Sequence, residues 1–308
     1  MSKIIVGCSG AKYIAKKIAK GIKASYGEIV LERFPDSELK IKIPDVKGKE
    51  VYFVQSFFKE FNDVNDKLIE VLFAAYTAKE LGAKKINLIA PYLAYMRQDT
   101  RFHKGEAVAN RILVKLFRIF DKVYAIEPHL HRLKSFKEFF PNAKKISLDV
   151  EVADFIRKKI KKDYVLVGPD MESEQWVKAI AERLKCDYVI LEKKRFSSRK
   201  VRIKGKRTKN KNVIIIDDII STGHTLIEAV KLVNAEKIYF IAMHGLFAEN
   251  ALKKLNKIGK VVVSDSILSK ASKIGCSNAI IQSIKKGKWN YNEEKRKKIS
   301  KSRSFIFY

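Results

Sequence analysis

The sequence predicts an α/β fold in which mostly parallel sheets are flanked by helices. Short β-rich runs alternate with longer helical runs along most of the chain. Several of the β-rich runs are almost continuously apolar, as expected for parallel strands that are covered on both faces. With 308 residues, 46% of them hydrophobic, the chain is long enough for two domains at roughly 100–200 residues each.

The expected strands are rich in β-branched and aromatic residues and end at polar or turn-forming positions. In the first half they are KIIVG (3–7), EVYFVQS (50–56), KINLIAPY (85–92) and KVYAIEP (122–128). In the second half they are YVLVGPD (164–170), YVILEKK (188–194), NVIIIDD (212–218), KIYFIAM (237–243) and KVVVSD (260–265). Helical segments lie between them, such as 66–82, in which Gly82 is a plausible C-cap.

A faint internal repeat indicates two tandem copies of one α/β unit. Residues 68–93 and 226–246 each begin with LIE at the start of a helix and continue through AKKI or AEKI into a strand. The expected cap positions, Gly82 and Asn234, are separated by about half the chain. Two copies of one unit are the simplest architecture that explains this spacing.

The composition restricts the expected cellular location and the expected binding partners. No apolar run approaches the ~20 residues that a membrane span needs, and the first residues lack the long apolar region of a signal peptide. We therefore expect a cytoplasmic location and no membrane partner. The formal net charge is +30, with 64 lysines and arginines against 34 acids. Helical spacing of the lysines favours scattered compositional bias. Non-specific electrostatic binding of nucleic acid and an anionic small substrate remain alternatives.

The most informative stretch is VIIIDDIISTGHTLIEAV (213–230). An apolar strand runs directly into two adjacent carboxylates, Asp217 and Asp218. In an open α/β sheet, ligands bind beyond the carboxyl ends of the strands, so both side chains should reach that edge. Small and hydroxylated residues then lead into the next helix: Ser221, Thr222, Gly223, His224 and Thr225.

This pattern suits a sugar phosphate. The turn and the helix N-terminus offer backbone N–H groups to a phosphate, while Gly223 permits a tight turn. The two carboxylates can accept hydrogen bonds from ribose hydroxyls and can bind Mg²⁺. Ordinary helix capping by Asp and Ser explains one acidic residue, but it does not explain two at the end of a β run.

IIIDDIISTGHT resembles the phosphoribosyl-pyrophosphate loop of type I phosphoribosyltransferase-like proteins. Further segments are similar to those of ribose-phosphate pyrophosphokinases, the archaeal members above all: RFPDSELKIKI (33–43), APYLAYMRQDTRFHKGEAVANR (90–111), PH (128–129), GPD (168–170) and EKKR (192–195). The resemblance covers 1–284 and implies two tandem phosphoribosyltransferase-like domains. It places the ATP-site segments in an N-terminal domain, 1–148, and the ribose 5-phosphate loop in a C-terminal domain, 149–284, followed by a basic tail, 285–308.

The resemblance also implies roles for individual residues. The ATP site would comprise Phe34, Asp36, Glu38, Arg97, Gln98 and Asp99. The ribose 5-phosphate site would comprise Asp217, Asp218, Ser221, Thr222, Gly223, His224 and Thr225. His129 and Asp170 match metal positions, and Lys193 and Arg195 match a catalytic basic pair. Two such cations can stabilise charge that develops on a transferred phosphoryl group, which makes the basic segment 195–212 a candidate lid.

The activity implied is transfer of the β,γ-pyrophosphoryl group of ATP to the C1 hydroxyl of ribose 5-phosphate, giving phosphoribosyl pyrophosphate and AMP. It implies Mg²⁺ as cofactor and a homo-oligomer, dimer or larger, with the ATP site near a subunit interface. One alternative is a catalytically weak regulatory homologue. It is favoured by Met171-Glu172, where the family has a small residue or Lys followed by Gly. The other is a phosphoribosyltransferase, which shares the loop but does not require FPD-x-E, Arg97-Gln98 or two tandem halves.

Overall fold

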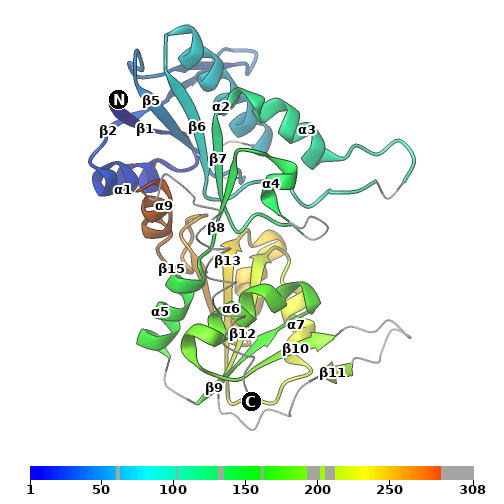
Figure 1. The fold of residues 1–308 in the computed structure, drawn as a ribbon. Helices are drawn as coiled ribbons and strands as arrows, with labels where there is room; N and C mark the ends of the chain where they lie inside the picture. The colour runs from blue at the N-terminus through cyan, green and yellow to red at the C-terminus, as the bar shows by residue number, and fades with distance from the viewer. Residues whose placement is uncertain are drawn as a thin grey trace, which may run out of the picture.

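The computed structural model describes residues 1–59, 63–101, 103–130, 135–160, 163–192, 202–204 and 212–285. Two sheets, one from each half of the chain, lie end to end with helices on their faces (Figure 1). Within these ranges, no helix is both long enough and apolar enough to cross a membrane.

The first sheet has the order β2-β1-β5-β6-β7-β8, and all of its strands are parallel. Its strands are β1 (Lys3–Gly7), β2 (Ser25–Glu28), β5 (Glu50–Val54), β6 (Lys85–Ala90), β7 (Lys122–Ile126) and β8 (Ala143–Ile146). The helices of this half are α1 (Lys12–Ile22), α2 (Val64–Glu80), α3 (Ala109–Leu116), η1 (Phe117–Ile119) and α4 (Phe136–Phe139). A separate antiparallel hairpin is formed by β3 (Val30–Arg33) and β4 (Leu39–Lys42).

The second sheet has the order β11-β10-β9-β12-β13-β14-β15, and only β11 runs antiparallel to its neighbour. Its strands are β9 (Tyr164–Gly168), β10 (Tyr188–Glu192), β11 (Arg202–Lys204), β12 (Asn212–Ile220), β13 (Lys237–Gly245), β14 (Lys260–Ser264) and β15 (Ser272–Ile274). The helices are α5 (Asp149–Lys159), η2 (Met171–Ser173), α6 (Glu174–Leu184), α7 (His224–Val230), η3 (Ala248–Asn250), α8 (Ala251–Asn256) and α9 (Ser277–Lys285).

The two sheets repeat one strand order. Leaving β11 aside, β10-β9-β12-β13-β14-β15 corresponds strand by strand to β2-β1-β5-β6-β7-β8. The registers agree as well, because Val213 pairs with Ile238 as Val51 pairs with Ile86. The predicted α/β class with two tandem units is therefore confirmed.

All nine expected strands are present, as β1, β5, β6, β7, β9, β10, β12, β13 and β14. The helix expected at 66–82 is α2, which starts two residues earlier because Asp63 caps it by accepting from the Asn65 N–H at 3.1 Å. Gly82 follows its end with φ +81°, a conformation that favours glycine. The first sheet ends at Ile146 and α5 starts at Asp149, but the domain division at 148/149 stays a prediction.

The two halves share one apolar core. It runs from one face of the first sheet, through α1, α5, α6 and α9, to one face of the second sheet. Two helix pairs make up this region: α9 of the second half lies against α1 of the first, and α5, which leads from the first sheet into the second half, lies against α6 (Figure 1). At the α1–α9 contact, a Cβ placed on Gly21 would stand 2.3 Å from the Cδ1 of Ile281, so glycine permits this close approach.

Two buried carboxylates stand at equivalent places in the two halves. Glu127 directly follows β7, and Asp265 directly follows the corresponding strand β14. The N–H of Glu127 donates to the Ile146 carbonyl at 3.0 Å, and the N–H of Asp265 donates to the Ile274 carbonyl at 2.8 Å. Each carboxylate therefore sits between the last two strands of its sheet, at their carboxyl ends.

Asp265 fastens the first half to the second. Its Oδ1 accepts from the N–H of Cys276 at 2.7 Å, and its Oδ2 pairs with the Nζ of Lys17 at 3.2 Å. The Tyr13 hydroxyl donates to its main-chain carbonyl. Since Tyr13 and Lys17 are on α1, this one residue holds the first helix of the chain against the second sheet.

The Asp265 contacts predict unequal effects of two substitutions. Asp265→Ala leaves the buried N–H of Cys276 without its acceptor and should lower the free energy of unfolding by about 1–3 kcal/mol. Lys17→Ala removes a side chain that is 55% exposed, and should cost less than about 1 kcal/mol. Urea unfolding followed by circular dichroism measures both values. Equal losses for the two variants would contradict this assignment.

Candidate functional site

A cavity of about 290 Å³ lies at the carboxyl ends of the second sheet, where the two halves meet. Arg97 and His129 contribute to it from the first half. The second half supplies the rest of its lining: Asp170, Glu172, Trp176, Asp217, Asp218, Ile219, Ile220, Ser221, Thr222, Gly223, His224, Thr225 and Leu226. The whole predicted sugar-phosphate stretch from Asp217 to Thr225 therefore lines one cavity.

Local structure explains how this stretch forms a cradle. β12 carries Asp217 and Asp218 past the point where its pairing with β9 ends at Ile215. Gly223 then turns the chain with φ +79°, and α7 begins at His224. The Gly223 carbonyl accepts from the N–H of Ile227 at 3.0 Å, so the turn is continuous with the helix. The N–H groups of the first turn of α7 face the cavity edge, where they suit an anion.

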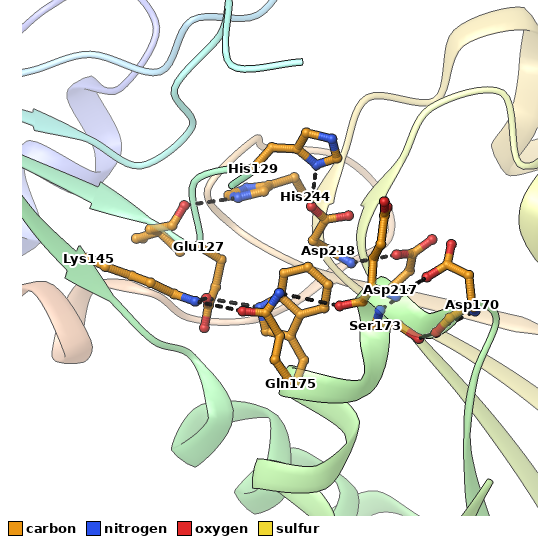
Figure 2. A network of polar contacts seen from close by, with 12 residues as sticks. Glu127, His129, Lys145, Asp170, Ser173, Gln175, Asp217, Asp218 and His244 are labelled. Atoms are coloured by element: carbon orange, nitrogen blue, oxygen red, sulfur yellow. Dashed lines mark hydrogen bonds and ion pairs between the residues drawn. The ribbon is translucent and has the colours of Figure 1, made fainter. Parts of the chain in front are cut away.

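His129 and Asp218 meet across the two halves. The Nδ1–H of His129 donates to Oδ2 of Asp218 at 2.7 Å (Figure 2). Asp218 is only 4% exposed, so this contact has little competition from water. His129 lies in the loop after β7 and Asp218 lies on β12, and no local sequence pattern links them.

Negative charge is concentrated in the cavity. Burial raises the pKa of Asp217 well above its ordinary value, and the charges of Asp218 and Asp170 raise it further. Burial also raises the pKa of Asp170, with a further contribution from Asp218. Three carboxylates therefore line one cavity in a chain of net charge +30, and a bound cation would offset their repulsion.

Asp170 also has a structural role. Its Oδ1 accepts from the N–H groups of Glu172 at 3.1 Å and Ser173 at 3.0 Å, which caps η2 ahead of α6 (Figure 2). The Ser173 hydroxyl donates back to the Asp170 carbonyl at 2.5 Å. Capping fixes the direction in which this carboxylate enters the cavity.

The donor set fits Mg²⁺ held together with a substrate. No group of three or more His, Cys, Asp or Glu side chains within the described ranges is arranged as a complete metal site. Mg²⁺ usually binds through one or two carboxylates and completes its shell with water and phosphate oxygens. The mutual repulsion of Asp170, Asp217 and Asp218 is the charge pattern that such an ion offsets. His129 and Asp170 stay the predicted metal residues.

The predicted ATP-site residues divide into two groups. Arg97 lines the cavity, and Gln98 and Asp99 follow it in the same loop without belonging to the described lining. Phe34, Asp36 and Glu38 do not reach this cavity. They form the turn of the β3–β4 hairpin, where the Phe34 N–H donates to the Glu38 carbonyl at 2.9 Å and Asp36 Oδ1 accepts from the Glu38 N–H at 3.2 Å. Phe34 is 48% exposed there.

Lys193 and Arg195 lie outside the described residues, as do most of the candidate lid and all of the tail beyond Lys285. Two lining residues were not predicted as site residues, Glu172 and Trp176. Glu172 had been singled out only as a departure from the family pattern. Trp176 lies on α6 with no motif around it, and its position at the cavity follows from the packing of α6 alone.

Comparisons with known proteins agree with this geometry. Residues 3–120 match the family model described as the N-terminal domain of ribose phosphate pyrophosphokinase, and residues 148–276 match the phosphoribosyl transferase domain. A ribose-phosphate pyrophosphokinase from Pyrococcus furiosus is 35% identical over 279 residues, covering 88% of this chain and 96% of the relative. One from Sulfolobus acidocaldarius is 33% identical, covering 88% and 95%.

A solved phosphoribosylpyrophosphate synthetase from Mycobacterium smegmatis has the same fold, with a TM-score of 0.79 over 92% of this chain and 98% of that chain, at 19% identity. The two tandem units and the match of residues 148–276 to the phosphoribosyl transferase domain define a phosphoribosyltransferase-like protein. Within that class, the chain belongs to the ribose-phosphate pyrophosphokinase family.

The raised pKa of Asp217 predicts a pH-dependent gain in stability for Asp217→Asn. The unfolded chain releases this proton near pH 3.8, whereas the folded protein retains it to higher pH. Stability is therefore lost as the pH rises through the folded pKa, and the asparagine variant should unfold at a higher temperature than the parent at pH 7. The difference should vanish near pH 3.8. Calorimetric scans across this pH range measure it.

Asp45→Asn provides the control. Its pKa is lowered, chiefly by a hydrogen bond from Lys49, so ionised Asp45 favours the folded state above its unfolded pKa. This substitution should give no gain at pH 7. An Asp217→Asn protein that is less stable than the parent at pH 7 would contradict this prediction, because it would show that the folded protein stabilises the ionised carboxylate.

Proposed function

We propose that this protein transfers the β,γ-pyrophosphoryl group of ATP to the C1 hydroxyl of ribose 5-phosphate, giving phosphoribosyl pyrophosphate and AMP. The relatives that it matches over nearly their whole length are named ribose-phosphate pyrophosphokinase. The observation that carries the proposal is the joining of Asp217–Thr225 with Arg97 and His129 in one cavity. In this arrangement the loop would bind the sugar phosphate, and Arg97 would stand beside it to bind a second phosphate group.

Ribose 5-phosphate would bind along the loop after β12. Its 5-phosphate would accept from the N–H groups and hydroxyls between Ser221 and Thr225, while Asp217 and Asp218 would accept from the ribose 2- and 3-hydroxyls. The Asp218–His129 contact would hold the second carboxylate in place for this role. The C1 hydroxyl would then point toward the wall formed by Arg97 and His129.

ATP would approach from the side of the first half. Arg97, together with Gln98 and Asp99, would hold its phosphates, since a guanidinium matches phosphate oxygens. The exposed hairpin turn with Phe34, Asp36 and Glu38 does not line the cavity of its own subunit, which supports a homo-oligomer in which this turn serves a neighbouring subunit. Lys193 and Arg195 would supply positive charge to the transferred group, a role that rests on the family pattern.

Mg²⁺, held by His129 and Asp170 together with the ATP phosphates, would neutralise the charge that the carboxylate-rich cavity cannot neutralise itself. The protein's own contribution is alignment. Asp217 and Asp218 fix the ribose, and Arg97 fixes the phosphate chain, so that the C1 oxygen faces the β-phosphorus. Phosphoryl transfer depends mainly on such positioning and on electrostatic stabilisation.

A catalytically weak homologue is the second candidate. Glu172 adds a further carboxylate to the cavity, and an acidic group near a phosphate site opposes substrate binding. Met171, the other half of this departure, is 52% exposed and does not belong to the described lining. Only one of the two unusual residues therefore affects the cavity.

An assay of AMP and phosphoribosyl pyrophosphate formation tests the proposed function. The purified protein with ATP, ribose 5-phosphate and Mg²⁺ should release the two products in equal amounts, as shown by ³¹P NMR. Turnover should stop when Mg²⁺ is removed with EDTA and return when it is restored. Binding of both substrates without product would assign the protein to the weak-homologue class.

The two sides of the cavity should be separable by substitution. Thr225→Ala should raise the Kd of ribose 5-phosphate by about 10–100-fold, the loss expected for one hydrogen bond to a charged group. Arg97→Ala should weaken ATP binding by a similar factor. Each variant should bind the other substrate within about threefold of the parent, because only a contact to one ligand is removed.

Isothermal titration calorimetry provides these constants, and Thr77→Ala on α2 is a matched control that should change neither. If Thr225→Ala weakened ATP binding and left ribose 5-phosphate binding intact, the assignment of the loop would be wrong.

A further inference from the structure

The Glu127 carboxylate is a buried polar junction beside the cavity. Its Oε1 accepts from the Ser147 hydroxyl at 2.6 Å and the Leu148 N–H at 3.2 Å. Its Oε2 accepts from Trp176 Nε1 at 3.0 Å and pairs with Lys145 Nζ at 2.8 Å (Figure 2). Four donors thus fill the four acceptor positions of an ionised carboxylate. Glu127 is only 1% exposed, and the contacts to Leu148 and Trp176 are buried, whereas the Lys145 side chain is 34% exposed.

These donors belong to both halves of the chain. Lys145 is on β8 of the first sheet, Ser147 and Leu148 lead into the second half, and Trp176 is on α6. Trp176 packs in the shared core and also lines the cavity. Lys145 reaches across the same junction, with its Nζ 5.9 Å from the centre of the Trp176 ring. Glu127 therefore connects the end of β7 to one wall of the cavity.

The segment that contains Glu127 also contributes to the opposite wall of the cavity. His129 follows two residues later and contacts Asp218. Directly before Glu127, the Ile126 carbonyl accepts from the Nε2–H of His244 at 3.1 Å. Because Nε2 carries the proton, the Nδ1 of His244 accepts from the Ser266 hydroxyl at 2.8 Å. Glu127 itself has φ +32°, a conformation that side chains rarely adopt, and its contacts must offset that strain.

The equivalent carboxylate in the other half makes none of its described contacts to a residue that lines the cavity. Asp265 also accepts from the N–H two residues beyond the next strand, as Glu127 does. Its remaining partners, Tyr13 and Lys17, belong to α1 and do not line the cavity. A buried carboxylate that accepts from this N–H thus occurs twice in the fold, once at the cavity wall and once away from it.

We infer that Glu127 is a positioning residue, which sets the separation between His129 and the wall formed by Trp176. This inference rests on the proposed function. A carboxylate is required because Trp176 and Lys145 are both donors. In Glu127→Gln, the amide NH₂ would face them, whereas the amide oxygen could still accept from Ser147 and Leu148. The substitution keeps the size of the side chain and removes only the contacts to Trp176 and Lys145.

The test compares Glu127→Gln with Asp265→Asn, two isosteric changes at equivalent buried positions. Both should lower the thermal midpoint. Glu127→Gln should also lower kcat by roughly 10–100-fold, because a shift of about 1 Å in the aligned groups costs a factor of this order. The KM for ribose 5-phosphate should stay within about threefold, since the loop from Ser221 to Thr225 keeps its contacts. Asp265→Asn should retain the parent kcat below its unfolding range.

Tryptophan fluorescence provides a readout that does not depend on turnover. The chain has two tryptophans, so Trp289→Phe leaves Trp176 as the only tryptophan, which can be excited selectively over tyrosine. In that background, Glu127→Gln should shift the emission wavelength, because the indole N–H loses its charged acceptor, and Asp265→Asn should leave it unchanged. If the parent made no product, the proposed function would fail, while the emission shift would still test the Glu127 contacts.

The double variant Glu127→Gln/Trp176→Phe completes the experiment. Because both changes break the same contact, its kcat should be no lower than that of the more impaired single variant. An unchanged kcat and emission in Glu127→Gln would overturn the inference. An equal loss of kcat in Asp265→Asn would also overturn it, since any weakening of the fold would then produce the effect.

Discussion

The arrangement of this protein depends on one constraint: a buried carboxylate must be surrounded by donors. Glu127 and Asp265 meet it in the same way, each directly after the fifth strand in the order of its sheet, leaving β11 aside, and each with a donor from the other half. Leaving such a group without partners would be costly, so neither half can move away freely. The shared apolar core supplies most of the burial, and these two residues fix the direction of packing.

The site adopts a charge pattern opposite to that of the chain as a whole. Lysines dominate the composition, yet the cavity gathers Asp170, Asp217 and Asp218 where each disfavours the ionisation of its neighbour. Such a concentration of carboxylates opposes folding, and a bound cation would relieve it. The surplus positive charge elsewhere raises the local concentration of anionic substrates without neutralising the cavity.

The sequence was sufficient for most of the scaffold. Continuous apolar runs predicted nine strands, and the acidic pair after 213–216 predicted the edge of the sheet where the cavity lies. The strands that escaped prediction, such as β8 (Ala143–Ile146) and β15 (Ser272–Ile274), are short and partly polar, so their pairing depends on the neighbouring strand rather than on their own pattern. No local signal pairs His129 with Asp218 or Glu127 with Trp176, because these contacts exist only once both units are packed.

The contact between α1 and α9 has a consequence for synthesis on the ribosome. The partner of the first helix is the last element that the structure describes, and Gly21 lies directly against Ile281. At 5–20 residues per second, the nascent first half waits on the order of tens of seconds before that partner is made. Throughout that interval the surface of α1 that packs against α9 is exposed to water or to a chaperone. The amino-terminal unit therefore lacks one of its packing partners while it is being synthesised. Because the carboxyl-terminal unit is translated last, its helix α9 completes the packing.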